Sequence, residues 1–331
     1  MTTPAERIPL VALVGATASG KTDLALALAE RLSAALGLRG AEIVSADSRQ
    51  IYRLMDIATA KPTGEERARV PHHLIDVVWP DEEYSLAQYQ RDAQAAIADI
   101  HARGRLPLLV GGTGLYVRAV VDGLAIPEVA PQPALRAELE AELATHGLAP
   151  LVARLAALDP VAAERIDARN PRRVIRALEV CLASGRPFSE QQGSRPTPYH
   201  SAMLGLRMDR AALYARADAR IAAMLAAGLL AETAALVARG YVWTLPAMSS
   251  LGYREMGAHL RGELTLAEAV TRFEHATHAY IRRQETWFRP DRRIHWLDAA
   301  QTPAALAGEA MRMALAALRE TADQQANLPA W

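Results

Sequence analysis

The fold is decided by an eight-residue stretch near the start of the chain, Gly15-Ala16-Thr17-Ala18-Ser19-Gly20-Lys21-Thr22. It fits the pattern G-x-x-x-x-G-K-[ST], in which glycines let the backbone wrap around an anion and amide groups at a helix N-terminus point at phosphate oxygens. The apolar run at 8–14 predicts a buried strand before it, and 22–36 has helical periodicity after it. A chance match in a glycine-rich turn is the alternative. The flanks favour a P-loop, in which Lys21 adds a charge and the Thr22 hydroxyl is placed for Mg²⁺.

Outward from this loop, strand-like and helix-like runs alternate. The apolar run at 106–110 ends in Gly111-Gly112, and an amphipathic helix precedes it at 85–103. Strands that alternate with helices predict a parallel sheet covered by helices on both faces, hence an α/β, P-loop NTPase-like fold. The remaining expected elements are strands at 42–46, 73–78, 203–208 and 293–297 and helices at 210–239 and 265–288.

The alternation of strand-like and helix-like runs stops in the middle of the chain. Pro127, Pro131 and Pro133 form one cluster of helix breakers, and prolines and glycines at 185–198 form another. Between them, 134–184 reads as helical throughout. We therefore predict an all-helical insertion domain at 127–198 within a P-loop core made of 1–126 and 199–331.

Composition places the chain among ordinary globular proteins. It has 331 residues, of which 51% are hydrophobic and 22% charged, and its formal net charge is zero. The single cysteine, Cys181, excludes an internal disulfide and a cysteine-based zinc site, and it is expected in the core. No apolar run reaches the roughly 18 residues that span a bilayer, and the N-terminus lacks a secretory pattern. We expect a cytoplasmic monomer with no membrane contact.

Lysine is rare in this chain. Lys21 and Lys61 are the two lysines among 37 basic residues. A coding bias towards arginine accounts for the imbalance, yet it draws attention to the two lysines that remain, because arginine differs from lysine in shape and hydration. Lys61 is either a solvated loop residue or a member of a site.

A lone carboxylate follows the second predicted strand. Asp47 stands in Ser45-Ala46-Asp47-Ser48-Arg49-Gln50. In an open parallel sheet ligands bind beyond the carboxyl ends of the strands, so Asp47 and the P-loop share one edge. Asp47 can serve there as a Mg²⁺ ligand, a general base or a helix cap. The strand at 106–110 is followed by no carboxylate, which disfavours a hydrolytic ATPase.

Several motifs together resemble one family. Besides the P-loop they are Ser-Ala-Asp-Ser-Arg-Gln-Ile-Tyr, Met-Asp-Ile-Ala-Thr-Ala-Lys-Pro, Pro-His-His-Leu-Ile-Asp, Leu-Leu-Val-Gly-Gly-Thr-Gly-Leu-Tyr, Asn-Pro-Arg-Arg-Val-Ile-Arg-Ala-Leu-Glu-Val, Leu-Gly-Tyr-Arg-Glu and Arg-Arg-Gln-Glu-Thr-Trp-Phe-Arg. Over 8–298 the chain resembles bacterial tRNA dimethylallyltransferases, the tRNA isopentenyltransferases. The resemblance implies transfer of a dimethylallyl group from dimethylallyl diphosphate to N6 of the adenosine on the 3′ side of the anticodon.

The resemblance also implies that the P-loop core is catalytic and that the insertion domain at 127–198 binds tRNA, and it implies roles for residues. Asp47 matches the general base, and Thr113 matches a position near the target nucleotide. The P-loop residues 15–22, Thr22 with Mg²⁺, and Arg220 would bind the diphosphate and stabilise its departure. The adenine must leave its stack to react. For Arg220 a solvated helix face, and for Thr113 a tight turn, are the alternatives.

Arginine clusters predict where RNA binds. Arg172, Arg173 and Arg176 lie on one predicted helix, and a second cluster with interleaved aromatics lies at 272–293. A solvated face with Arg176–Glu179 pairing, and aromatic core anchors, are the alternatives. The full set of expected tRNA contacts is Asp47, Ser48, Arg49, Gln50, Thr113, Arg136, Arg172, Arg173, Arg176, Gly252, Tyr253, Arg254, Arg282, Arg283, Gln284 and Arg289.

Two departures from the family pattern bear on that set. Ser249 and His278 stand where basic residues are common, and each change removes an expected phosphate contact. Three other functions stay open: an isopentenyltransferase acting on free AMP, a small-molecule or nucleoside kinase, and a non-catalytic RNA-binding protein that uses nucleotide as a switch. The arginine clusters argue against the first of these, because a free nucleotide needs no such surface.

Overall fold

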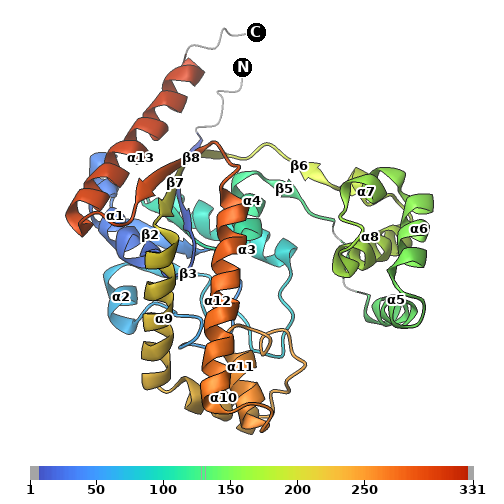
Figure 1. The fold of residues 1–331 in the computed structure, drawn as a ribbon. Helices are drawn as coiled ribbons and strands as arrows, with labels where there is room; N and C mark the ends of the chain where they lie inside the picture. The colour runs from blue at the N-terminus through green and yellow to red at the C-terminus, as the bar shows by residue number, and fades with distance from the viewer. Residues whose placement is uncertain (1–6, 128, 131, 327–331) are drawn as a thin grey trace. The chain divides into compact units, whose positions relative to one another are not determined.

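The computed structural model describes residues 7–127, 129, 130 and 132–326 (Figure 1). The described residues fall into two compact units, one within Met1–Val121 and Pro198–Trp331 and the other within Asp122–Thr197. The second unit therefore begins before the expected boundary at 127, because the chain from 122 already belongs to it.

A parallel sheet forms the centre of the first unit. Within the described residues its strand order is β3-β2-β4-β1-β7-β8, and each neighbouring pair is parallel. This is the P-loop NTPase-like sheet that the alternating pattern predicts. The strands are β1 (Ile8–Gly15), β2 (Ala41–Ser45), β3 (His72–His73), β4 (Leu106–Gly111), β7 (Tyr199–Arg207) and β8 (Ile294–Asp298).

The third predicted strand is shorter than expected. The sequence pattern predicts this strand at 73–78, whereas β3 ends at His73. Leu74 and Asp76 adopt positive φ angles of 62° and 57°, which break the extended run. Val78 returns to form an isolated bridge with Tyr52, so this segment is a loop against the end of the sheet.

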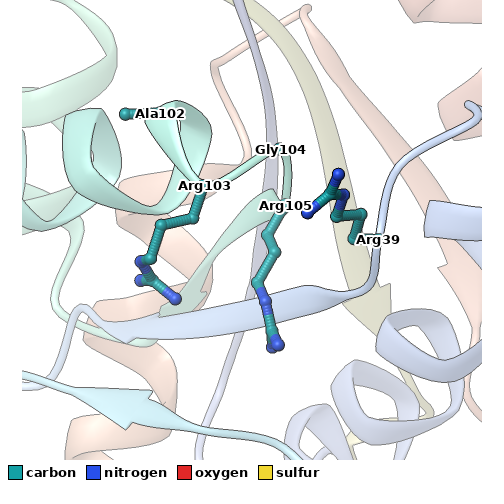
Figure 2. Close-up of a pocket in the computed structure, with 5 residues that line it drawn as sticks. All are labelled: Arg39, Ala102, Arg103, Gly104 and Arg105. Atoms are coloured by element: carbon teal, nitrogen blue, oxygen red, sulfur yellow. The ribbon is translucent and has the colours of Figure 1, made fainter.

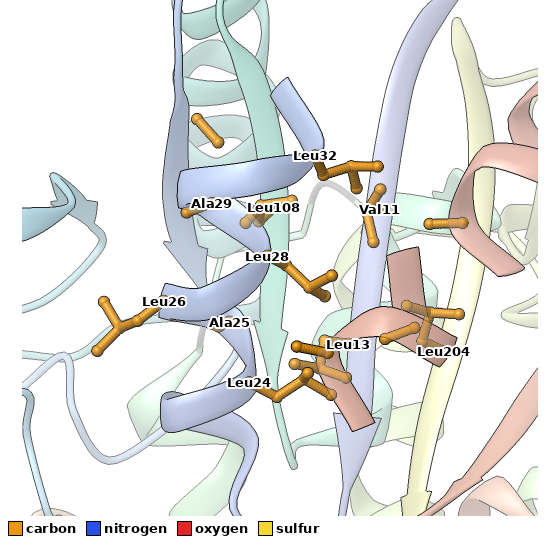
Figure 3. Close-up of a cluster of buried hydrophobic side chains, with 14 of the residues drawn as sticks. Val11, Leu13, Leu24, Ala25, Leu26, Leu28, Ala29, Leu32, Leu108 and Leu204 are labelled. Atoms are coloured by element: carbon orange, nitrogen blue, oxygen red, sulfur yellow. The ribbon is translucent and has the colours of Figure 1, made fainter. Parts of the chain in front are cut away.

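Helices cover both faces of the sheet because side chains along β1 alternate in direction. Val11 and Leu13 pack against α1 (Lys21–Ala35) and α13 (Pro303–Ala326), as Figure 3 shows for Leu24, Leu28 and Leu32 of α1. Leu10, Ala12 and Val14 face α3 (Leu86–Ala102) and α4 (Gly114–Val121). The Ser85 hydroxyl and the Gln88 side chain form a capping box that begins α3.

A further group of helices packs beside the carboxyl ends of the strands. It comprises α9 (Arg210–Ala226), α10 (Leu229–Ala238), α11 (Tyr253–Leu260) and α12 (Leu266–Phe288), whereas the short helix α2 (Gly64–Arg69) precedes β3 and pairs through Arg69 with Glu30 of α1. The single helix expected at 210–239 is broken, because Gly228 adopts a left-handed φ of 98° between α9 and α10. None of the described helices is by itself long and apolar enough to cross a bilayer. α9 and α10 reach that composition only as a pair bent by 57°.

The second unit is mainly helical. It contains α5 (Pro133–His146), α6 (Leu148–Leu158), α7 (Pro160–Arg165) and α8 (Pro171–Ser184), with a 3₁₀ turn at Ser189–Gln191. It also contains an antiparallel ribbon of β5 (Leu124–Ala125) and β6 (Gly193–Ser194), so it is not all-helical as expected. Cys181 is buried in its core against the other apolar helix faces, which confirms the expectation for that residue.

Candidate active site

The P-loop connects β1 to α1 at the carboxyl edge of the sheet. Gly15 ends β1, and a Cβ there would lie 3.1 Å from both the Leu206 carbonyl oxygen and the Ser19 hydroxyl. Gly20 takes a left-handed φ of 93° as the N-cap of α1, so no side chain crowds the turn. The Ser19 amide donates to the Ala16 carbonyl at 3.3 Å. The loop therefore leads into the N-terminus of α1, where backbone amides are available to bind an anion.

Lys21 brings a charge to this loop. Its Nζ donates to the Ala16 carbonyl at 2.7 Å. Burial of the ammonium group lowers the pKa of Lys21 to about 8, opposed by the Asp47 charge and reinforced by that of Arg220. Burial also lowers the pKa of Arg220, again opposed by Asp47. The three charges therefore act on one another, although they come from α1, α9 and the β2 loop.

Asp47 stands two residues beyond the end of β2, at the same edge as the P-loop. Its Oδ1 accepts a hydrogen bond of 2.8 Å from the Arg49 amide. Within the part of the chain that the structure describes, Oδ2 accepts no hydrogen bond, and the side chain is partly exposed. The turn that follows is not a helix, so the helix-cap alternative is wrong, and one carboxylate oxygen remains available to a ligand.

Thr113 lies beside Asp47 because the loop after β4 crosses the loop after β2. Its backbone amide donates to the Ala46 carbonyl at 3.1 Å, and its Oγ1 accepts from the Ser48 amide at 3.1 Å. Gly111 makes this crossing possible, since a Cβ there would lie 2.2 Å from the Ala46 carbonyl oxygen. The structure thus brings the predicted base and the predicted nucleotide contact together.

Gln284 has a role that the sequence pattern does not reveal. This residue of α12 is buried, its Oε1 accepts from the Thr17 amide at 2.9 Å, and its Nε2 donates to the Gly112 carbonyl at 3.0 Å. Both ends of the amide are therefore used to join the P-loop to the β4–α4 loop. Gln284 holds the two loops in register, a role other than the tRNA contact predicted for it, and that contact stays a prediction.

Tyr280 is a second residue of the site that sequence reasoning did not single out. It interacts with the Thr113 side chain one turn before Gln284, and burial raises the pKa of its phenol to about 12. The phenol therefore stays protonated at neutral pH and remains a hydrogen-bond donor. The signal in the sequence was its place among arginines, which suggested stacking rather than a hydroxyl contact.

A magnesium ion fits the mouth of the P-loop. The Thr22 hydroxyl is partly exposed and, across the described ranges, has no protein hydrogen-bond partner. No cluster of three or more His, Cys, Asp or Glu residues that could hold a metal occurs among the described residues. Mg²⁺ prefers oxygen ligands and keeps water and phosphate oxygens. One hydroxyl beside a phosphate site suits such an ion, whereas a closed protein cage is not found.

Three other residues expected at the RNA surface make contacts within the protein: Gly252 and Tyr253 are buried, and Gln50 is partly exposed. Gln50 donates from Nε2 to the Ala60 carbonyl at 3.1 Å and accepts from the Ser45 hydroxyl at 3.0 Å, which fixes a neighbouring turn. Gly252 would place a Cβ 2.7 Å from that of Ala58. Tyr253 is fully buried and donates to Glu232. These internal contacts give all three residues a structural role, and their tRNA contacts stay predictions.

In the second unit one buried carboxylate organises the arginines. Glu179 is fully buried and pairs with Arg136 at 2.9 Å and Arg176 at 2.7 Å. It also accepts from the Gln132 amide at 2.8 Å. The single charge of Glu179 offsets only one of the two positive charges, but both guanidinium groups are held by it, which supports the pairing alternative for Arg176. Arg172 and Arg173 are exposed on the same helix, and the N-cap side chain of Asn170 begins it.

On α12 the expected RNA-facing arginines are exposed. Arg282 donates to the Tyr214 hydroxyl at 3.0 Å, and the guanidinium of Arg283 lies 5.6 Å from the centre of the Tyr280 ring. Arg289 is exposed at the end of the helix. Arg254 is exposed as well and pairs with Glu255. These residues remain candidates for phosphate contacts.

A pocket at the other edge of the sheet is structural. It has a volume of about 550 Å³ and is lined by Arg39, Ala102, Arg103, Gly104 and Arg105, just before β4 begins (Figure 2). Arg103 and Arg105 both pair with Glu42, whose pKa is lowered to about 2, chiefly by the hydrogen bond from Arg103. The basic side chains therefore serve a buried carboxylate, far from the P-loop edge.

Comparison with known proteins agrees with this geometry. The family described as IPP transferase matches residues 50–291. A protein named tRNA dimethylallyltransferase from Roseiflexus sp. (strain RS-1) is 57% identical over 282 residues, which cover 85% of this chain and 90% of the relative.

Two solved structures are similar over most of their length. The full-length tRNA isopentenylpyrophosphate transferase from Bacillus halodurans superposes with a TM-score of 0.72 at 39% identity, covering 96% of this chain and 99% of the other. A eukaryotic dimethylallyltransferase acting on tRNA gives a TM-score of 0.72 at 25% identity, covering 88% and 74%. The chain therefore belongs to the IPP transferase family.

Proposed function

We propose that this protein transfers a dimethylallyl group from dimethylallyl diphosphate to N6 of the adenosine next to the anticodon, on its 3′ side, in tRNA. The observation that carries the proposal is the meeting of Asp47 with Lys21 and Arg220 at one edge of the sheet. A carboxylate facing an anion site is what this reaction needs, since one substrate must lose a proton while the other loses diphosphate.

In the proposed reaction N6 of adenine attacks C1 of the dimethylallyl group. The new N6–C1 bond forms as the C1–O bond breaks, and the diphosphate leaves with the bonding electron pair. The amine loses a proton to Asp47, whose Oδ2 is the free oxygen. Because an exocyclic amine is a weak nucleophile, removing its proton as the bond forms lowers the barrier.

The charge that develops on the diphosphate meets several fixed donors. Backbone amides at the N-terminus of α1 are placed to donate to it, and Lys21 and Arg220 add positive charge. Mg²⁺ held at Thr22 would neutralise part of the remaining charge. Thr113, beside Asp47, is placed to contact the extruded base.

The direct test is mass analysis of tRNA incubated with purified protein, Mg²⁺ and dimethylallyl diphosphate. We expect one adenosine to gain the mass of one five-carbon unit. Transfer of label from γ-labelled ATP to an acceptor, with no gain on tRNA, would instead identify a kinase. Modification of free AMP in preference to tRNA would identify the nucleotide-level enzyme.

The pKa of Lys21 predicts a pH dependence of diphosphate binding. A group with a pKa of about 8 is mostly protonated at pH 7 and mostly neutral at pH 9. The cationic form binds the anion, so affinity falls as pH rises through that range, by about tenfold between pH 7 and 9. Calorimetric titration with inorganic pyrophosphate would measure it. A Lys21→Arg variant keeps its charge over this range and serves as the control for titration of the ligand. Equal pH slopes in both proteins would contradict the assignment.

A further inference from the structure

Between α9 and α12 lies a polar cluster that the proposed reaction does not use. Nε2 of His278 on α12 lies 2.8 Å from Oδ1 of Asp218 on α9. The imidazole stacks on the Tyr214 ring, with centroids 4.0 Å apart and planes 6° from parallel. The Tyr214 hydroxyl in turn accepts from Arg282 at 3.0 Å. We call these four residues the α9–α12 clasp.

The contacts of the clasp are not the contact to RNA phosphate that was expected of a residue at position 278. His278 stands where a basic residue is common and a phosphate contact was expected. Its side chain is 18% exposed, and its partners are on the neighbouring helix. A side chain that is paired and stacked in this way is not free to reach out to RNA.

The helix on the other side of the clasp carries Arg220. Along α9 the residues Leu213, Ala217 and Ile221 form the buried stripe. Tyr214 and Asp218 each follow a stripe residue by one position, whereas Arg220 precedes one by one position. At 3.6 residues per turn these positions lie on opposite flanks of the stripe. A roll of α9 about its axis would therefore move Arg220 as it breaks the clasp.

Ile221 packs in a large apolar cluster with residues of α10, α11 and α12, but at the turns that carry the clasp the buried stripe resists such a roll only weakly. Leu213 and Ala217 pack with Ala16 of the P-loop and Ile281 of α12 in a small apolar cluster. Two of these four residues are alanines, whose side chains offer little area and no directional contact. The contact between His278 and Asp218 and the parallel ring contact do have direction.

We propose that His278 is a positioning residue: through Asp218 and Tyr214 it fixes the rotation of α9 and so holds Arg220 against the diphosphate site. The inference rests on the proposed function for its meaning, since Arg220 is the residue through which it acts. On this proposal the histidine at position 278, where the family commonly has a basic residue, affects the anion site rather than RNA docking.

The test uses inorganic pyrophosphate, so it needs neither RNA nor the prenyl donor. We expect His278→Ala to weaken pyrophosphate binding roughly three- to tenfold, the size of one lost stacked pair. His278→Arg can still pair with Asp218 and lie on Tyr214, so it should restore most of the affinity. His275→Ala changes an exposed histidine on the same helix and should have no effect.

A double-mutant cycle separates positioning from an independent contact. In an Arg220→Gln background, His278→Ala should cause little further loss, because the group that it positions is gone. A full loss in that background overturns the proposal, as does unchanged pyrophosphate affinity together with a raised KM for tRNA. Should His278→Ala fail to fold, Asp218→Asn removes the charge from the other side and is expected to act in the same direction; unchanged affinity there overturns the proposal too.

The two hypotheses fail in different ways. Absence of prenyl transfer by the wild-type protein refutes the proposed function, whatever the clasp does. Wild-type transfer combined with equal pyrophosphate affinity in His278→Ala and His275→Ala refutes the clasp and leaves the function standing.

Discussion

Asp47→Asn is expected to lower kcat for prenyl transfer by about 10²–10⁴-fold, because an amide cannot accept the proton that N6 releases. The substitution keeps the shape of the side chain, and its Oδ1 can still accept from the Arg49 amide. The loop after β2 should therefore retain its conformation. Single-turnover kinetics with saturating tRNA and dimethylallyl diphosphate would measure the chemical step.

Binding separates this effect from a structural one. Asp47→Asn should bind tRNA with nearly unchanged affinity, since the lost charge is not needed for phosphate contacts. Ser48→Ala, at the next position, is the matched control and should change kcat far less, because the Ser48 amide that contacts Thr113 remains. Transfer at the wild-type rate by Asp47→Asn would refute its assignment as the base.

Lys21→Ala is expected to be the second most damaging change, at about 10²–10³-fold in kcat, the loss typical of one donor to a developing anion. It removes a charge from the P-loop and leaves the Ala16 carbonyl without its 2.7 Å donor. The kinetic readout is kcat with saturating diphosphate substrate, so that weaker binding alone does not produce the loss.

Lys21→Arg distinguishes charge from shape. A guanidinium keeps the charge but is planar and larger than the ammonium that the loop encloses. An intermediate activity is expected. Wild-type activity in Lys21→Ala would mean that the P-loop amides and Arg220 suffice, and would overturn the role given to this lysine.

The sequence predicted the parts of the site that are local in the chain. The spacing of its glycine, lysine and threonine residues identifies the P-loop. Asp47 follows an apolar run that ends at the ligand-binding edge of a parallel sheet. The alternation of strands and helices was enough for the fold class. These features depend on neighbours within a few residues, which is why a pattern detects them.

What the sequence did not predict depends on partners far away along the chain. The amide of Thr17 meets Gln284, 267 residues later, and no local pattern distinguishes a buried glutamine from an exposed one on α12. The sequence pattern predicts a solvated arginine face around Glu179. In the structure Gln132, the N-cap residue of α5, and Arg136 of α5 contact Glu179, which is buried. Contacts between elements, rather than properties of one element, decided both.

Lys61 lies in a buried environment of this kind, one that favours lysine over arginine. Its ammonium group is buried and donates to the Tyr52 carbonyl, Asp56 and Asp76, each at 2.6 Å. It is therefore neither solvated nor part of the anion site. Three acceptors around one nitrogen match a tetrahedral donor, whereas a flat guanidinium spreads its protons over a wider fork. In a chain whose other basic residues, Lys21 apart, are all arginines, this site is therefore one that the shape of a lysine fits and that of an arginine does not.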